Sequence, residues 1–313
     1  MYATGPRGLP VFVPAVIGRS SMLSSSSGTR YGERAGSDGW VATRAFSGPV
    51  RPRVKVRIII LMYHGVIATG GAAANMHCVP ESCFIEQMNY LKVSGHPVLP
   101  WGDLSAGRLA GNGTAVGLTF DDANLSDVTC ASILQSRGYS ALFFVPTDYL
   151  GRSGRLARTD VAELSRQGMG IGSHSHHHVQ LVRLDDSQLD EELRRSKGIL
   201  EDIIKLPVEH VSFPGGSYNG RVLAAARKAG YRYFYTSEWG SNGARETAAG
   251  VLRRIPVVDG LNIEGFRNIV EMPNYRTKRA QFHLKELAKR ALGEQSYLRL
   301  RRALVKRPSA PDK

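Results

Sequence analysis

Hydrophobic runs alternate with amphipathic stretches along residues 54–237. The run VKVRIIILMY (54–63) has the length and the Val and Ile content of a buried strand. In residues 80–95 the apolar positions follow a helical spacing and end at Gly95, a common helix stop. The same patterns predict further strands at 114–120, 140–146, 168–173, 209–215 and 231–237, and further helices at 126–137, 159–167, 186–204 and 219–229. Regular alternation of strand and helix predicts a parallel sheet, either open or closed into a barrel.

The two ends of the chain depart from this alternation. Residues 1–53 are rich in Gly, Ser, Arg and Pro without sustained periodicity, which predicts a disordered or loosely ordered basic segment. Residues 276–313 contain the stretch FHLKELAKRALGEQSYLRLRRALV, in which apolar positions recur at helical spacing between basic residues. We therefore predict one folded domain over 54–275, followed by a basic amphipathic helical tail that is interrupted near Gly293.

Positive charge is concentrated at the same two ends. The chain of 313 residues has a formal net charge of +14, but residues 1–53 hold seven Lys and Arg against two acids, and residues 276–313 hold twelve against three. The middle of the chain is therefore neutral, with 22 of each. A nucleic-acid enzyme carries positive charge on its folded domain, so we predict no nucleic-acid partner. The basic tail could lie on an anionic membrane surface, contact an acidic partner, or pack on the folded domain.

Cysteine usage and hydropathy bear on the compartment. The three cysteines, Cys78, Cys83 and Cys130, cannot all pair internally, and we expect free thiols rather than a Cys78–Cys83 bridge. No apolar run approaches the roughly 18 residues of a membrane span. The stretch LPVFVPAVIG (9–18) is short and contains two prolines, which is atypical of a secretory signal. These patterns favour a cytoplasmic or peripheral membrane location over secretion.

Ionisable side chains follow three of the predicted strands. His64 comes directly after the first strand, Asp121 and Asp122 after the second, and His174 after the fourth. Because the carboxyl ends of parallel strands meet at one rim, we expect these residues to lie near one another. An acid after a strand can also be a helix cap, and a strand-end histidine can simply bond to the backbone. Three such ends together nevertheless indicate an active site.

The segment GSHSHHHVQL (172–181) holds four histidines within five positions. Histidine is the commonest side-chain metal ligand, and two that lie one helical turn apart can bind one ion. On spacing alone His174 could pair with His177 or with His178, while His176 lies between them. The alternative is a solvated polar loop. The segment thus predicts a metal site whose second histidine the spacing leaves open.

These motifs resemble those of the NodB-type polysaccharide deacetylases, carbohydrate esterase family four. LTFDDA (118–123) is similar to the family's TFDDG motif and HSHHH (174–178) to its H(S/T)xxH motif, and their separation of about fifty residues also matches. The resemblance runs from LMYHGV through SFPGGSYN to LRRIPV, some two hundred residues. It is greatest with the branch that opens on a YH strand and acts on exopolysaccharides such as poly-N-acetylglucosamine. The resemblance implies an irregular (β/α)7-type barrel.

The resemblance also implies roles for these residues. The metal ligands would be Asp122, His174 and His178, holding one divalent cation, with zinc favoured over Co²⁺, Ni²⁺ or Fe²⁺. Asp121 would act as the general base, and His64, the histidine of the YH strand, as the general acid. His177 and His176 would then not bind the metal.

The SFPGGSYN turn supplies the remaining candidates. Backbone N–H groups after Pro214, in Gly215 and Gly216, would donate to the oxyanion that develops during hydrolysis. Tyr218 and Trp239 could line a sugar-binding cleft, since flat rings suit the apolar faces of sugars, although aromatic residues near strand ends also fill cores.

Three positions depart from the family pattern. The C-terminal Leu-x-Leu-x-His motif that often supplies the acid is missing, which is why the role passes to His64. Ser212 stands where many members carry an arginine that steadies the base, and Arg254 could take over that role or form a surface or structural salt bridge. Ala123 replaces a glycine, at a cost of about 1 kcal/mol if the position requires positive φ.

The sequence therefore predicts a metal-dependent hydrolase that removes N-acetyl groups from an N-acetylated sugar or polysaccharide. One alternative is a relative that hydrolyses another non-peptide carbon–nitrogen bond. The other is a carbohydrate-binding homologue without turnover, although such a protein would not need to retain the base Asp121 beside a full set of ligands.

Overall fold

The structure is a computed structural model that describes residues 57–67, 78–106 and 113–271, together with the single positions 275, 277, 280, 281 and 284. All of these residues belong to one compact unit, Pro52–Lys313. The predicted N-terminal segment 1–53 and, apart from those single positions, the predicted amphipathic tail lie outside the described residues. Within the described part of the chain, no helix has the length and apolar character needed to cross a membrane.

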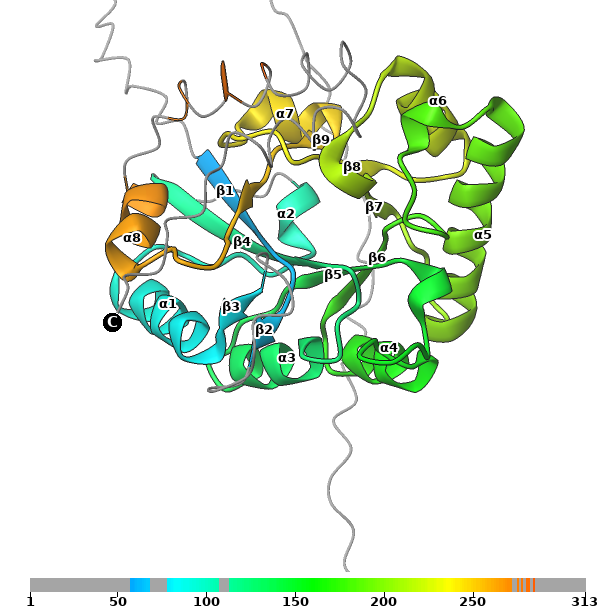
Figure 1. The fold of residues 1–313 in the computed structure, drawn as a ribbon. Coiled ribbons are helices and arrows are strands. Elements are labelled where there is room, and N and C mark those ends of the chain that lie inside the picture. Colours follow the sequence, from blue (N-terminus) through cyan, green and yellow to red (C-terminus); the bar gives the residue numbers. More distant parts are fainter. Residues whose placement is uncertain are drawn as a thin grey trace, which may run out of the picture. The chain divides into compact units, whose positions relative to one another are not determined.

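A parallel sheet of eight strands forms the centre of the described fold, in the order β10-β1-β4-β5-β6-β7-β8-β9 (Figure 1). Its strands are β1 (Arg57–Tyr63), β4 (Thr114–Asp121), β5 (Leu142–Val145), β6 (Gly170–Ser173), β7 (His210–Ser212), β8 (Tyr233–Tyr235), β9 (Val251–Leu252) and β10 (Ile255–Pro256). A separate parallel pair consists of β2 (Val66–Ile67) and β3 (Val79–Pro80).

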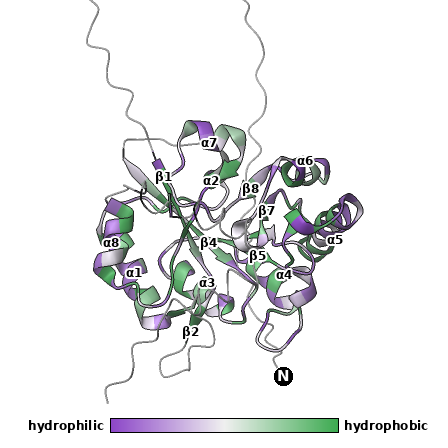
Figure 2. Cartoon of the chain, turned by 45° about the horizontal axis from the view of Figure 1, so that its top comes forward, coloured by the Kyte–Doolittle hydropathy of each residue, from purple (hydrophilic) through white to green (hydrophobic). Residues whose placement is uncertain are grey.

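Helices connect the strands and surround the sheet (Figure 1). The α-helices are α1 (Glu81–Val93), α2 (Asp103–Ala106), α3 (Asp127–Gln135), α4 (Arg158–Arg166), α5 (Asp186–Ile204), α6 (Gly220–Lys228), α7 (Ala244–Ala249) and α8 (Ile263–Glu271). Three short 3₁₀ turns are η1 (Thr147–Tyr149), η2 (Leu181–Arg183) and η3 (Pro214–Gly216). Helices such as α5 and α6 carry hydrophilic residues on one side and hydrophobic residues on the other (Figure 2), as expected of helices that cover a sheet.

Both faces of the central strands are buried. Along β1, Ile59 and Leu61 belong to the main core, whereas Ile58 and Ile60 belong to a smaller cluster with Phe144. Strands that are buried on both faces read as continuous apolar runs, which explains the unbroken apolar run from Ile58 to Tyr63 in β1.

The predicted fold class and the predicted order of strands and helices are confirmed, with boundaries that move by a few residues. The largest difference concerns the strand predicted at 209–215, which ends at Ser212. Pro214 begins η3 there, because proline has no N–H to donate to a neighbouring strand. The three cysteines are unpaired, as expected.

The two edge strands of the sheet, β9 and β10, are connected by a two-residue segment. Leu252 in β9 aligns with Tyr235 in β8, and Ile255 in β10 aligns with Leu61 in β1. Only Arg253 and Arg254 separate β9 from β10, so the chain crosses from one edge of the sheet to the other within two residues. This crossing places Arg254 in the interior of the barrel, where it is fully buried.

Candidate active site

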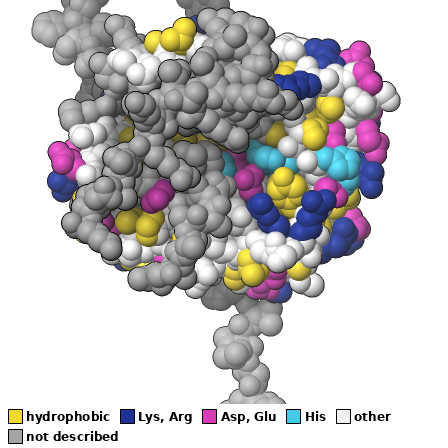
Figure 3. All heavy atoms as spheres, in the orientation of Figure 1, with side chains coloured by type: hydrophobic (Ala, Val, Ile, Leu, Met, Phe, Trp, Pro, Cys, Tyr) yellow, Lys and Arg dark blue, Asp and Glu magenta, His cyan; other side chains and the backbone are white. Residues whose placement is uncertain are grey.

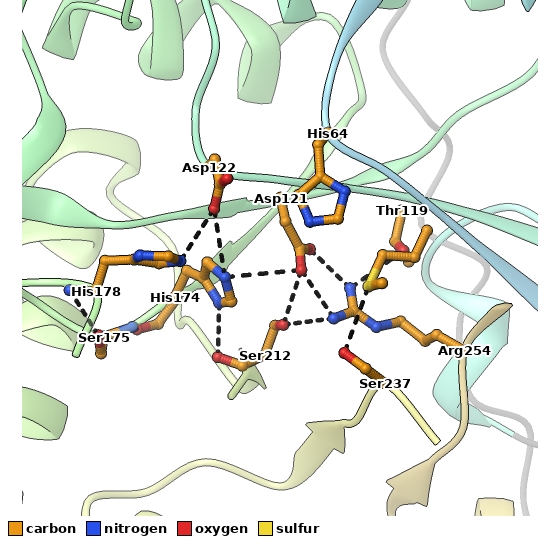
Figure 4. Close-up of polar contacts among 12 residues, drawn as sticks. His64, Thr119, Asp121, Asp122, His174, Ser175, His178, Ser212, Ser237 and Arg254 are labelled. Atoms are coloured by element: carbon orange, nitrogen blue, oxygen red, sulfur yellow. Dashed lines mark hydrogen bonds and ion pairs between the residues drawn. The ribbon is translucent and has the colours of Figure 1, made fainter. Parts of the chain in front are cut away.

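The carboxyl ends of the strands bring the predicted site residues together (Figure 4). In the register of β1 and β4, Tyr63 aligns with Phe120, so His64 and Asp121 leave neighbouring strands at the same level. His174 follows β6, and its ring reaches toward Asp121 and Asp122 (Figure 4). The expectation that separate strand ends meet at one rim is therefore met by the fold.

Asp122, His174 and His178 form a compact group of possible metal ligands. One ligand atom from each residue lies within 4.8 Å of the others. The Nε2 of His178 is 3.1 Å from Oδ1 of Asp122, and the Nε2 of His174 is 3.6 Å from the same oxygen. These distances leave room for a cation between an anionic oxygen and two ring nitrogens. One carboxylate and two imidazoles also form a donor set that suits zinc and similar ions.

The two histidines lie on a tight turn, not on a helix as their spacing suggested. Ser175 and His178 have positive φ values of 63° and 58°, and the Ser175 hydroxyl accepts a 3.1 Å hydrogen bond from the N–H of His178. The carbonyl oxygen of Ser212 lies 2.9 Å from Nδ1 of His174. A proton on Nδ1 would donate to this carbonyl and leave the lone pair of Nε2 for a metal, a common way of fixing a ligand tautomer.

His177 and His176 point away from this group. The backbone N–H groups of both donate to Oε2 of Glu192 on α5, each at 2.9 Å, and Nδ1 of His177 contacts Oε1 of the same carboxylate. Nδ1 of His176 lies 2.7 Å from the hydroxyl of Thr147. The geometry therefore separates two histidines that face Asp122 from two whose rings contact α5 and η1.

Asp121 is held by a buried arginine. Arg254 donates from Nη1 to Oδ1 of Asp121 at 2.7 Å and from Nη2 to Oδ2 at 2.8 Å. Nη2 also donates to the hydroxyl of Ser212 at 2.7 Å, and that hydroxyl donates to Oδ2 of Asp121 at 3.2 Å. Arg254 thus contacts both carboxylate oxygens from the position between β9 and β10. The contact is a buried ion pair, so a surface salt bridge is excluded and the orienting role coincides with a structural salt bridge.

The charges of the site favour ionised carboxylates and neutral imidazole. Burial raises the pKa of Asp121, but the charge and hydrogen bonds of Arg254 outweigh burial and hold that pKa below its ordinary value. Burial also raises the pKa of Asp122, but the hydrogen bond with His178 reverses the effect, so that pKa is lowered. Burial lowers the pKa of His174 to about 4. A neutral imidazole is the form that binds a metal.

His64 extends from the end of β1 toward Asp121 (Figure 4). Its backbone carbonyl accepts a 2.6 Å hydrogen bond from Nδ2 of Asn124, and the thiol of Cys78 lies 3.4 Å from the same oxygen. These bonds fix the backbone of His64 next to the Asp121–Asp122 segment and leave its side chain as the group directed at the site.

The predicted oxyanion turn needs one correction. Gly215 and Gly216 both have positive φ, of 65° and 69°, and the N–H of Gly216 donates to the carbonyl of Phe213 at 2.8 Å. Because that donor is already used and Pro214 has no N–H, Gly215 is the remaining candidate among the three. A Cβ on Gly216 would lie 2.5 Å from Cβ of Ser237, so this position accepts only glycine.

The rings of the two aromatic candidates, Tyr218 and Trp239, both contact other aromatic side chains. The ring of Tyr218 stacks on Phe213, with centroids 5.6 Å apart, and is partly buried against the main core. The ring of Trp239 lies 6.4 Å from that of Tyr275. Much of each ring therefore serves packing, and Tyr218 stays a predicted contact for the sugar.

Ala123 adopts the conformation that glycine usually occupies. Its φ is 52°, so the condition for a backbone cost of about 1 kcal/mol is met. The side chain is 1% exposed and belongs to the main core, and burying a methyl group returns roughly the same amount. The departure from the family glycine therefore leaves stability nearly unchanged.

Two residues beside the group of possible metal ligands were not predicted from the sequence. The hydroxyl of Tyr149 lies 3.3 Å from Nδ1 of His178, and Arg155 lies over the Tyr149 ring at 4.7 Å. Nη1 of Arg155 donates to the backbone carbonyl of Asp122 at 2.8 Å. Tyr149 follows a strand end, which was a usable signal, but nothing in the local sequence marks Arg155, because it reaches the site only through the fold.

Comparisons with known proteins agree with the family resemblance of these motifs. Residues 109–234 match the family model described as Polysaccharide deacetylase. The chain carries a polysaccharide deacetylase domain. This deacetylase is 26% identical, over 71% of its chain and 79% of the relative, to YxkH of Bacillus subtilis (strain 168), which bears the name of a polysaccharide deacetylase.

Two solved structures share the fold of this deacetylase. The deacetylase PplD of Streptococcus pyogenes, in complex with acetate, is 24% identical with a TM-score of 0.63, over 70% of this chain and 100% of its own. A de-N-acetylase from Aggregatibacter actinomycetemcomitans is 17% identical with a TM-score of 0.61, over 68% and 99%. The predicted family and barrel are confirmed, as is the predicted class of hydrolase acting on non-peptide carbon–nitrogen bonds.

Proposed function

We propose that this deacetylase is metal-dependent and removes N-acetyl groups from an N-acetylated sugar or polysaccharide, with Asp122, His174 and His178 as the metal ligands. The observation that carries the proposal is the juxtaposition of this ligand group with Asp121. The Oδ2 atom of Asp121 lies 3.7 Å from Nε2 of His174, yet Asp121 is bound by Arg254 rather than grouped with the ligands. One carboxylate is thus available to bind a cation and the other to accept a proton.

Each residue has a specific task in this proposal. A divalent cation, with zinc favoured, supplies Lewis acidity that polarises the acetyl carbonyl and lowers the pKa of a water molecule. Asp121 accepts the proton of the attacking water, since its bonds with Arg254 and Ser212 use three of roughly four acceptor positions of the carboxylate. The N–H of Gly215 donates to the developing oxyanion, and His64 donates a proton to the departing amine.

The proposal also covers the identity of the glycan substrate. One structural neighbour is named a de-N-acetylase, and the YH strand of this chain resembles the branch that acts on exopolysaccharides such as poly-N-acetylglucosamine. The first observation supports removal of an N-acetyl group, and the second supports an N-acetylglucosamine polymer as the substrate. A homologue that only binds carbohydrate is disfavoured, because such a protein has no use for a buried arginine that orients the base.

Acetate release tests this function. Metal-free full-length protein, reconstituted with Zn²⁺, Co²⁺ or Ni²⁺, is incubated with N-acetylglucosamine oligomers, peptidoglycan fragments, acetylated xylan and a cyclic imide. We expect acetate from the N-acetylglucosamine oligomers and none without metal. Turnover of the imide alone would move the activity to another carbon–nitrogen bond, and binding of oligomers without acetate release would support the non-catalytic alternative.

His64→Ala separates proton donation from organisation of the site. We expect amide hydrolysis to slow by roughly a hundredfold or more, the usual contribution of a positioned acid, with metal content unchanged. An aryl acetate ester, whose leaving group needs no proton, should be cleaved at nearly the wild-type rate. His96→Ala, at a histidine that bonds to Thr114 outside the site, is the control. Equal losses on ester and amide would show that His64 positions other groups.

A further inference from the structure

A second group of possible metal ligands lies on the other side of the histidine segment. Asp148, His176 and His177 each offer one ligand atom, and these atoms lie within 4.8 Å of one another. None of the three belongs to the group of Asp122, which uses the histidines on the opposite side of the turn. Histidine side chains reach the surface on the face shown in Figure 3, between acidic and basic side chains.

The elements that carry these ligands are already tied together. Asp148 lies on η1 after β5, and the two histidines follow β6, the neighbouring strand. The N–H of Asp148 donates to the carbonyl of His176 at 3.0 Å, and the rings of His176 and His177 are 4.2 Å apart between centroids. The ligand positions are therefore set by the ends of two neighbouring strands of the central sheet.

Outer groups orient both rings as they do in metal sites. Glu192, 6% exposed, contacts Nδ1 of His177, and the hydroxyl of Thr147 lies 2.7 Å from Nδ1 of His176. With Nδ1 engaged, each ring can offer Nε2. A buried carboxylate bonded to the far nitrogen of a histidine is the arrangement that fixes ring orientation and raises ligand basicity at zinc sites. Glu192 is an observation independent of the ligand group itself, because it lies on α5.

We propose that Asp148, His176 and His177 form a second divalent-cation site, distinct from the deacetylase centre, that clamps the loops after β5 and β6. Two imidazoles and one carboxylate favour Zn²⁺, Ni²⁺ or Co²⁺ over Mg²⁺ and Ca²⁺, which prefer oxygen ligands. Tyr149 directly follows Asp148 and contacts His178, so a cation here also steadies a neighbour of the first ligand group.

The Arg152 guanidinium would compete with a cation for the Asp148 carboxylate. Arg152 forms an ion pair with Asp148, and 56% of the arginine side chain is exposed. A cation and the guanidinium compete for the same carboxylate, so binding at this site is weaker than at the first group and releases Arg152. This competition yields an opposite effect for two substitutions: loss of a ligand weakens binding, whereas loss of Arg152 strengthens it.

Calorimetric titration of full-length, metal-free protein with Zn²⁺ tests the site. In the background Asp122→Ala/His178→Ala, which removes two ligands of the first group, we expect one equivalent to remain. Adding His177→Ala or Asp148→Asn should abolish it, and adding Glu192→Gln should weaken it by about tenfold or more. Adding Arg152→Ala should tighten it about two- to fivefold, the contribution of one exposed ion pair.

Controls keep the result unambiguous. His96→Ala in the same background should leave the remaining equivalent unchanged, and circular dichroism should show that each variant is folded; the His177 side chain is 49% exposed, so its replacement leaves the core intact. Absence of any equivalent in the background variant, its retention in either ligand variant, or weaker binding in Arg152→Ala would overturn the proposal. Since the readout is binding, the result is independent of the proposed deacetylase activity.

Discussion

Asp121→Asn is expected to lose turnover and to keep its metal, whereas Asp122→Asn should lose the metal itself. Asparagine retains the shape of Asp121 but cannot take a proton from water, so the rate should fall by about a hundredfold to ten-thousandfold. Asp122 supplies the only anionic oxygen of its ligand group, and its amide would bind a divalent cation far more weakly. Metal content by mass spectrometry and acetate release on the same samples check both expectations.

Stability must be controlled in this comparison, because Asp121→Asn also leaves Arg254 without a counter-charge. Assays below the melting temperature, with the fold verified by circular dichroism, keep the two effects apart. Asp127→Asn is a control for the exchange of a buried carboxyl group for an amide outside the ligand group; burial raises the pKa of Asp127, so this exchange tests the amide without the loss of a charge. If Asp121→Asn and Asp122→Asn lost metal to the same extent, the assignment of one base and one ligand would be wrong.

Local patterns were enough to predict the main strands and helices up to residue 237, because each buried run and each amphipathic stretch is a property of neighbouring residues. The short elements β2, β3 and α2, and all elements after β8, were not predicted. The i, i+4 histidine pair was predicted from the family motif, but its turn geometry was not. That geometry depends on positive φ at Ser175 and His178, which no spacing rule predicts for non-glycine residues.

Contacts that join distant segments could not be predicted in the same way. The sequence left open whether Arg254 orients the base, since 133 positions separate the two residues and their contact exists only because β9 and β10 lie at opposite edges of the sheet. The use of the Gly216 N–H within its own turn was likewise invisible in SFPGGSYN. Proximity of side chains that follow neighbouring strands could therefore be predicted from the sequence. Contacts that form only when the sheet curls into a barrel, such as that of Arg254 with Asp121, could not.

Arg254→Met is expected to destabilise the fold by about 3–5 kcal/mol, because it leaves the buried Asp121 carboxylate without its partner. Arg253→Met, one residue earlier, is the matched control. Arg253 pairs with Glu246 at 2.9 Å and lies 3.4 Å from Glu238, but 21% of its side chain is exposed, so its loss should cost less than the loss of the fully buried Arg254. Urea unfolding at neutral pH measures both. Equal losses in the free energy of unfolding would show that the buried Asp121–Arg254 pair contributes no more to stability than the contacts of Arg253.

The same substitution should change the pH dependence of both stability and activity. In the wild type the pKa of Asp121 is held low by Arg254 against burial, so the pair stabilises the fold at neutral pH, and this stability is lost as the pH falls below about 4, the ordinary value, toward the folded pKa. Without Arg254, burial raises the pKa of Asp121. The base is then protonated up to a higher pH, and the acidic limb of the activity profile should move upward.

A double-mutant cycle completes the test of this pair. Asp121→Asn/Arg254→Met removes both charges, so its loss of stability should be smaller than the sum of the two single losses by more than about 1 kcal/mol. Arg254→Lys keeps the charge but lacks the planar fork that contacts both carboxylate oxygens, so it should fold better than Arg254→Met and still turn over slowly. Additive losses, or full activity in Arg254→Lys, would mean that Arg254 fills space between β9 and β10 without orienting the base.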